Sequence, residues 1–201
     1  MSLEREAMAA IILAGGLSSR MGTDKALLAM GGASLLESLV SRFAERMGRV
    51  IVVLRADQDV EVEQSLTVRD IHQGAGPLGG LHAGLTASPD EENFVLACDM
   101  PLADPELGLW ILSKLSGHDA VVPMLARGPE PLHAAYRKSC LPAVESSIAA
   151  GRLRMRDTLD RLDVLYIPEH EMKQRDPDLR SFLNINTPED YREALRIIGT
   201  S

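Results

Sequence analysis

The sequence predicts an α/β protein built on a doubly wound, mostly parallel sheet, and three observations lead to this prediction. Short apolar runs rich in Val and Ile alternate with stretches of helical periodicity. These runs are apolar almost throughout, which is typical of strands covered by helices on both faces. The chain has 201 residues, 45% of them hydrophobic, and no repeat or linker divides it. We therefore expect a single domain over residues 1–201.

The first part of the chain predicts a regular succession of strands and helices. The expected strands are 8–14, 49–54, 67–71, 94–98 and 119–124, and the expected helices between them are 34–48, 77–88 and 104–115. Gly48 is expected to end the first helix, because glycine is common just past a helix end. Since parallel strands joined by a helix form right-handed crossovers, this succession predicts a doubly wound sheet.

The remaining part is less regular. A strand is expected at 131–136, a helix at 141–150 and a short strand at 164–167, followed by a charged stretch at 169–180 and then residues 182–186. The final helix is strongly indicated, with Thr187 as N-cap, Pro188 at its first position and acidic residues in its first turn. Residues 1–7 are expected to form a disordered tail.

Composition excludes several classes of protein. A net charge of -8 and 3% aromatic residues argue against a nucleic-acid-binding surface. The longest apolar run, 8–14, is too short to span a membrane, and Glu4 and Glu6 argue against a secretory signal. Cys98 and Cys140 have no metal-ligand spacing and cannot form a disulfide framework, which fits a reducing compartment. We therefore expect a soluble cytoplasmic protein.

The segment 13–25, LAGGLSSRMGTDK, directly follows the first expected strand, where an open α/β sheet binds its ligand. It combines conformationally free glycines, hydroxyl side chains and two cations, namely Gly15, Gly16, Gly22, Ser18, Ser19, Thr23, Arg20 and Lys25. Backbone N–H groups beside cations bind polyphosphates. The alternative is a flexible connection with incidental basic residues. The segment is not a Walker A loop, because two residues separate Gly22 from Lys25.

A second glycine-rich segment matches the G-x-G-x-x-G pattern of dinucleotide-binding proteins. It spans 74–79, and Asp99 follows twenty residues later. In that motif an apolar strand runs into the first glycine, whereas here Asp70 and His72 interrupt the approach. We favour a tight backbone surface that passes close to a ligand, and an NAD-dependent oxidoreductase remains the alternative.

Two aspartates, Asp70 and Asp99, fall near the carboxyl ends of expected strands. Mg²⁺ is commonly held by one or two carboxylates together with phosphate oxygens, so Asp99 is a candidate metal ligand. The simpler alternatives are a turn residue for Asp99 and a cap of the glycine-rich turn for Asp70, because Asp often bonds the backbone two residues on. The acidic residues concentrate at 61–120, which carries ten acidic and two basic residues.

Five segments of the chain resemble the molybdenum cofactor guanylyltransferases. They are LAGGLSSRMGTDKALL at 13–28, GPLGGLHAGL at 76–85, LACDMPL at 96–102, EPLHAAY at 130–136 and FLNINTPED at 182–190. The first and third are shared with the wider nucleotidyltransferase superfamily, and the last two are more discriminating. The resemblance spans nearly the whole chain. It implies a Rossmann-like nucleotidyltransferase fold of the glycosyltransferase-A type.

The resemblance also implies a reaction and its residues. GMP from Mg-GTP would be joined to the terminal phosphate of molybdopterin cofactor, with release of pyrophosphate and with Mg²⁺ as the cofactor. The residues it implies are Leu13, Ala14, Gly15, Gly16, Lys25, Asp70, Gly76 and Gly80 for the nucleotide, Asp99 for both metal and nucleotide, Arg20 and Lys25 for offsetting charge during transfer, and Asn184 and Asn186 for the pterin substrate. Residues 54–57, LRAD, depart from the small polar residue or Asn that the family often carries near the nucleoside.

Several assignments stay open at this point. Arg154 and Arg156, with Arg152, are expected either to bind the acceptor or to form a solvated basic face. His133 is expected to be a core or site-lining residue with satisfied hydrogen bonds rather than a metal ligand. Alternatives in function are a cytidylyltransferase, another phosphorylated acceptor, and a non-catalytic nucleotide-binding regulator. Transient contact with cofactor-handling proteins is a further expectation.

Overall fold

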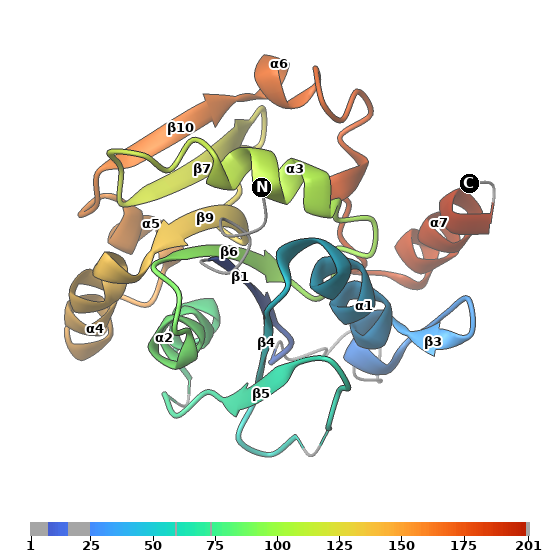
Figure 1. Ribbon diagram of the computed structural model, residues 1–201, viewed down its shortest axis with the longest axis horizontal. Coiled ribbons are helices and arrows are strands. Elements are labelled where there is room, and N and C mark those ends of the chain that lie inside the picture. Colours follow the sequence, from blue (N-terminus) through green and yellow to red (C-terminus); the bar gives the residue numbers. More distant parts are fainter. Residues whose placement is uncertain (1–7, 16–24, 59, 73, 200–201) are drawn as a thin grey trace.

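Figure 1 shows the computed structural model of the chain, which describes residues 8–15, 25–58, 60–72 and 74–199. A sheet runs through its middle in the order β10-β7-β9-β6-β1-β4-β5, with β8 paired to β7. Its strands are β1 (Met8–Leu13), β4 (Val50–Leu54), β5 (Leu66–Arg69), β6 (Glu92–Ala97), β7 (Ala120–Leu125), β8 (Gly128–Pro129), β9 (His133–Arg137) and β10 (Val164–Pro168). The tail predicted at residues 1–7 lies outside the described residues.

The sheet is mostly parallel, as predicted. β1 pairs in parallel with β4 and β6, β4 with β5, and β10 with β7. β9 is the exception in the centre, because it runs antiparallel to both β6 and β7. Its reversal brings the residues before β9 to the edge where β6 ends, and the Ala97 N–H donates to the Leu132 carbonyl at 3.0 Å.

Helices cover both faces of this sheet (Figure 1). The first core lies under α1 (Leu35–Met47), α3 (Pro105–Leu112), α6 (Glu169–Met172) and α7 (Pro188–Gly199). The second core lies under α2 (Pro77–Ala87), α4 (Leu141–Ala149) and α5 (Met155–Leu159). Successive residues of β1 alternate between the two cores, with Ile12 in the first and Ile11 in the second, and both are fully buried. This confirms the doubly wound prediction.

The predicted ends of α1 and the predicted start of α7 are confirmed by their caps. Ser34 begins α1 in a capping box with Glu37, and Gly48 ends it at φ 75°. At α7, the Thr187 hydroxyl accepts from the Asp190 N–H at 3.2 Å and the Asp190 carboxylate accepts from the Thr187 N–H at 2.8 Å. Reciprocal side-chain bonds of this kind satisfy the N–H groups that a helix start leaves unpaired.

Some predicted boundaries were wrong by one to three residues. The strand predicted at 67–71 ends at Arg69, because the Asp70 carboxylate accepts from the His72 N–H at 2.7 Å and turns the chain. The strand predicted at 131–136 begins only at His133, whose N–H closes a turn on the Glu130 carbonyl. The helix predicted at 104–115 is shorter, and Asp104 caps it instead of joining it.

Several short elements were not predicted. They are β2 (Ala29–Met30), β3 (Ala33–Ser34), β8, α5, α6 and the 3₁₀ turns η2 (Lys25–Leu27), η3 (Lys138–Cys140) and η4 (Arg180–Phe182). Elements of two to five residues are too short to show a hydrophobic period. None of the helices described in the structure is long and apolar enough to cross a membrane.

Candidate active site

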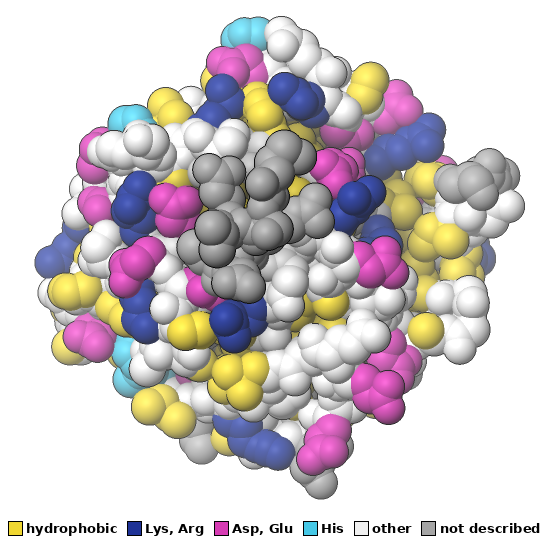
Figure 2. Space-filling model, viewed as in Figure 1, with side chains coloured by type: hydrophobic (Ala, Val, Ile, Leu, Met, Phe, Trp, Pro, Cys, Tyr) yellow, Lys and Arg dark blue, Asp and Glu magenta, His cyan; other side chains and the backbone are white. Residues whose placement is uncertain are grey.

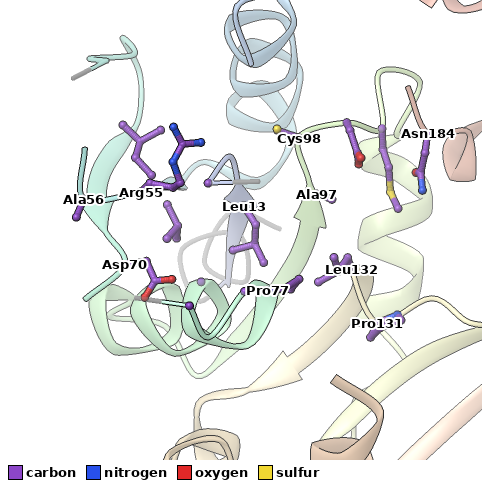
Figure 3. Close-up of a pocket in the computed structure, with 18 of the residues that line it drawn as sticks. Leu13, Arg55, Ala56, Asp70, Pro77, Ala97, Cys98, Pro131, Leu132 and Asn184 are labelled. Atoms are coloured by element: carbon purple, nitrogen blue, oxygen red, sulfur yellow. The ribbon is translucent and has the colours of Figure 1, made fainter. Parts of the chain in front are cut away.

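A cavity of about 920 Å³ opens at the carboxyl edge of the parallel strands (Figure 3). This volume lies within the range of small-molecule sites, and the carboxyl edge is where open α/β sheets bind ligands. Its lining comes from the ends of β1, β4 and β6, the start of α2, and the segments before β9 and α7. The lining residues are Leu13, Gly15, Val53, Leu54, Arg55, Ala56, Asp57, Asp70, Gly74, Gly76, Pro77, Gly80, Ala97, Cys98, Asp99, Met100, Glu130, Pro131, Leu132 and Asn184.

The cavity has two sides. In Figure 3, Arg55, Ala56 and Asp70 lie on one side, whereas Pro131, Leu132 and Asn184 lie on the other, with Leu13 between them. We call these the β4 side and the β9 side. Two ligands brought together here could therefore contact different sets of residues.

On the β4 side, the turn after β1 packs tightly against the turn after β4. A Cβ at Gly15 would lie 3.2 Å from both Cγ and N of Arg55, so a larger residue would push the two turns apart. The buried Gln58 side chain joins the same turns. Its Oε1 accepts from the Arg55 N–H at 2.8 Å, and its Nε2 donates to the Ala14 carbonyl at 3.4 Å. The relative position of these two turns is thus fixed by close packing at Gly15 and by the hydrogen bonds of Gln58.

The start of α2 forms the floor between the two sides. Gly76 precedes the helix at φ 59° without a side-chain cap, and the first residues of α2 line the cavity. Such a helix end attracts anions such as phosphate. Gly80 packs on Leu13, and a Cβ there would lie 3.3 Å from its side chain. Gly79 has even less room, because a Cβ there would lie 2.6 Å from Oδ2 of Asp70.

On the β9 side, Asp99 follows β6 and lines the cavity together with Asn184. The two segments are joined, since the Ile185 N–H donates to the Asp99 carbonyl at 2.8 Å. Oδ1 of Asn184 is buried and has no hydrogen-bond partner among the described residues. Arg42 of α1 stabilises the turn after Asp99, because its guanidinium donates to the carbonyls of Pro101 at 2.5 Å and Ala103 at 3.2 Å. Burial lowers the pKa of Arg42.

The structure brings together seven of the residues predicted for the site, namely Leu13, Gly15, Asp70, Gly76, Gly80, Asp99 and Asn184. Ala14 is buried behind the lining, and the N–H of the exposed Asn186 bonds to Asp190. Arg154 and Arg156 are exposed and do not line the cavity, so their role stays a prediction. Gly16, Arg20 and the side chain of Lys25 lie outside what the structure describes.

Sequence reasoning missed other residues of the site. Gln58 and Arg42 act on the cavity through backbone contacts, which no sequence motif reveals. Glu130 belongs to the segment EPLHAAY, for which no site role was predicted at this position, and it lines the cavity. In the stretch 54–57, Arg55 pairs with Asp57 at 2.9 Å, and this hydrogen bond lowers the pKa of the Asp57 carboxyl.

His133 differs from its prediction in one respect. It is a fully buried core residue, as expected, and its ring lies against Phe94 and Phe182 with centroids 5.0 and 4.6 Å away. The expectation of satisfied hydrogen bonds was wrong, because neither ring nitrogen has a partner among the described residues. Burial lowers the pKa of His133 to about 3, so the ring is neutral near pH 7.

The residues present fit a magnesium ion held mainly by its substrate. Among the described residues no group of three or more His, Cys, Asp or Glu side chains could hold a metal ion. Asp99 supplies one carboxylate on the cavity wall. Mg²⁺ is usually bound by one or two carboxylates together with substrate phosphates and water.

Comparisons with solved structures agree with this fold. Molybdopterin-guanine dinucleotide biosynthesis protein A from Archaeoglobus fulgidus superposes with a TM-score of 0.84 at 30% identity, covering 96% of this chain and 100% of that one. A 2-C-methyl-D-erythritol 4-phosphate cytidylyltransferase from Thermus thermophilus has a TM-score of 0.71 at 18% identity, covering 95% and 98%. The latter similarity concerns the fold alone.

Sequence comparisons identify the family. A protein of Methanosarcina mazei named "Probable molybdenum cofactor guanylyltransferase" is 38% identical over 96% of this chain and 92% of its own length. The molybdenum cofactor guanylyltransferase of Desulfosudis oleivorans is 32% identical over 94% of this chain and 95% of its own length. The model of the MobA-like NTP transferase domain matches residues 10–164. The chain therefore belongs to the MobA-like NTP transferases, the nucleotidyltransferase family that includes the molybdenum cofactor guanylyltransferases.

Proposed function

We propose that this enzyme transfers GMP from Mg-GTP to the terminal phosphate of molybdopterin cofactor. An oxygen of the acceptor phosphate forms a bond to the α-phosphorus of GTP. The bond from that phosphorus to the bridging oxygen breaks, and pyrophosphate leaves. The observation that carries the proposal is one cavity lined by the turns after β1 and β4, by the start of α2 and, on its β9 side, by Asp99 and Asn184.

The nucleotide is assigned to the β4 side. Gly15 and Gly80 line the cavity, and the N-terminal end of α2 attracts the negative charge of the phosphates. Asp70 is assigned to the nucleoside, and Arg20 and Lys25 remain assigned to the phosphates. The acceptor phosphate is already ionised near neutral pH, so no protein nucleophile is required. The chain contributes by positioning two anions and offsetting their repulsion.

Magnesium is assigned to Asp99. A divalent ion at this carboxylate would supply positive charge to oppose the charge that develops on the leaving pyrophosphate. Asn184 is assigned to orienting the acceptor, because its buried Oδ1 lacks a partner in the described part of the chain and its segment is bonded to the Asp99 backbone. We place the reaction in the cytoplasm, consistent with the two free thiols Cys98 and Cys140, and expect transient contact with cofactor-handling proteins.

The direct test is reconstitution with purified molybdopterin cofactor and labelled GTP or CTP. We expect labelled dinucleotide from GTP and a loss of turnover of about a hundredfold or more in Asp99→Asn, the scale seen when charge stabilisation is removed. Asp178→Asn is the matched control, because Asp178 is exposed and outside the cavity. A preference for CTP would change the donor, and unimpaired turnover of Asp99→Asn at saturating Mg²⁺ would contradict the metal assignment.

Thermal shift measurements separate the alternative classes. A ligand present at about 100 times its Kd stabilises the native state by about 2.7 kcal/mol. GTP with Mg²⁺ should raise the Tm, whereas NAD should leave it unchanged. A shift with NAD alone would favour the oxidoreductase interpretation of residues 74–79.

A further inference from the structure

The β9 side of the cavity combines apolar residues with two acidic ones, Asp99 and Glu130. Met100, Pro131 and Leu132 are the apolar residues of this lining, and Glu130 lines the cavity beside them. The reversed direction of β9 places this segment beside the end of β6. A flat heterocycle suits such a surface, because its faces can lie on apolar side chains while its edge bonds to a polar group.

The Glu130 carboxylate is held in place. Its side chain is 14% exposed, and its Oε1 accepts from Nε of Arg127 at 2.5 Å. The described residues give Oε2 no hydrogen bond. Arg127 also donates to the Phe182 carbonyl at 2.9 Å, which ties this wall to the segment that carries Asn184. The Tyr136 hydroxyl further fixes the turn by donating to the Pro131 carbonyl at 2.8 Å.

This arrangement fits a ligand edge with adjacent N–H donors. A carboxylate is an acceptor only, and two parallel N–H groups can bond it in a bidentate manner. The 2-amino-4-oxopyrimidine ring of a pterin has such an edge, formed by its 2-amino group and the neighbouring ring N–H. The pairing of Glu130 with Arg127 offsets the carboxylate charge, so a phosphorylated acceptor meets less repulsion.

We propose that Glu130 is a specificity-determining residue that recognises the aminopyrimidinone edge of the acceptor. The inference deepens the proposed function and rests on its assignment of the pterin to the β9 side. Guanine has the same type of edge, so the position of Glu130 is what assigns it to the acceptor. Its neighbours Pro131 and Leu132 lie across the cavity from Arg55 and Asp70 (Figure 3).

The test measures binding without turnover. Fluorescence titrations would give the Kd of the wild type and Glu130→Gln for 6-hydroxymethylpterin monophosphate and for its lumazine analogue, in which a 2-oxo group replaces the 2-amino group. We expect the wild type to prefer the pterin by about tenfold, the scale of one charge-assisted hydrogen bond. Glu130→Gln should lose this preference and bind lumazine within about twofold of the wild type. Glu91→Gln, an exposed position at the opposite end of β6, should behave like the wild type.

Each outcome decides the inference. Equal weakening of pterin and lumazine by Glu130→Gln would mean a general disturbance of the wall and would overturn it. A loss of GTP affinity with unchanged pterin preference would also overturn it, by placing guanine at this carboxylate. The proposed function is judged separately by dinucleotide formation. A wild type that prefers the pterin but forms no dinucleotide would refute the transfer while leaving the role of Glu130 intact.

Discussion

Replacing Gly79 by alanine tests the contact between α2 and Asp70. The new Cβ would lie 2.6 Å from Oδ2 and 2.8 Å from Oδ1, whereas a relaxed C···O contact needs about 3.3 Å, so the carboxylate must move by about 0.7 Å. That movement breaks the 2.7 Å bond from the His72 N–H, at a cost of about 1.5–3 kcal/mol for a charged acceptor. Alanine is favoured over glycine inside a helix by about 0.5–1 kcal/mol.

The net expectation for Gly79→Ala is a loss of about 1–2 kcal/mol, or about 2–8 °C in Tm for a chain of this length. Calorimetry would measure the Tm, and titration with Mg-GTP would show weaker binding because Asp70 is displaced. The decisive control is the same substitution in an Asp70→Ala background, where alanine at position 79 has room and should stabilise. An equal Tm change in both backgrounds would refute the reasoning.

Three further predictions concern the supports of the site and the core. Arg42→Met should lower both the Tm and the turnover, because it releases the backbone after Asp99. A melting curve and steady-state kinetics would measure both quantities, and a lower Tm with unchanged turnover would contradict the role in the site. Ser34→Ala should cost about 1 kcal/mol by removing the cap of α1, with turnover unchanged in the same assays. Because the pKa of His133 is lowered to about 3 in the native state, the unfolded state binds its proton first and stability falls as pH drops below about 6.5. Between about pH 6.5 and 4.5, His133→Phe should lose about 2 kcal/mol less unfolding free energy than the wild type. Urea melts at several pH values would measure this, and the same change of unfolding free energy with pH in both proteins would contradict it.

The regular part of the fold was predictable because its signals are local. Apolar strands and capped helices such as α1 and α7 are encoded by residues within a few positions of each other. The direction of β9 was not predictable in this way, because pairing partners distant in sequence decide it. Its late start depends on the turn from Glu130 to His133, which periodicity does not show.

The site was predictable to a similar degree. Asp70, Asp99 and the glycines near β1 and α2 were located because strand ends meet at one edge of a sheet. Gln58 could not be located, since its effect depends on two backbone groups 3 and 44 residues away. The distribution of charge along the sequence did not predict its distribution on the surface. Figure 2 shows acidic and basic side chains interspersed over one face of the molecule, although the acidic excess is confined to residues 61–120 of the sequence.

The reversal of β9 has a consequence for how such enzymes can diversify. Because the strand enters the sheet at the cavity edge, the β8–β9 connection can change length or sequence without altering the turns after β1 and β4. Selection on this connection could exchange one acceptor for another while the machinery that binds the donor is inherited unchanged. Under the proposed assignment of the substrates, one antiparallel strand lets the residues that bind the acceptor vary independently of those that bind the donor.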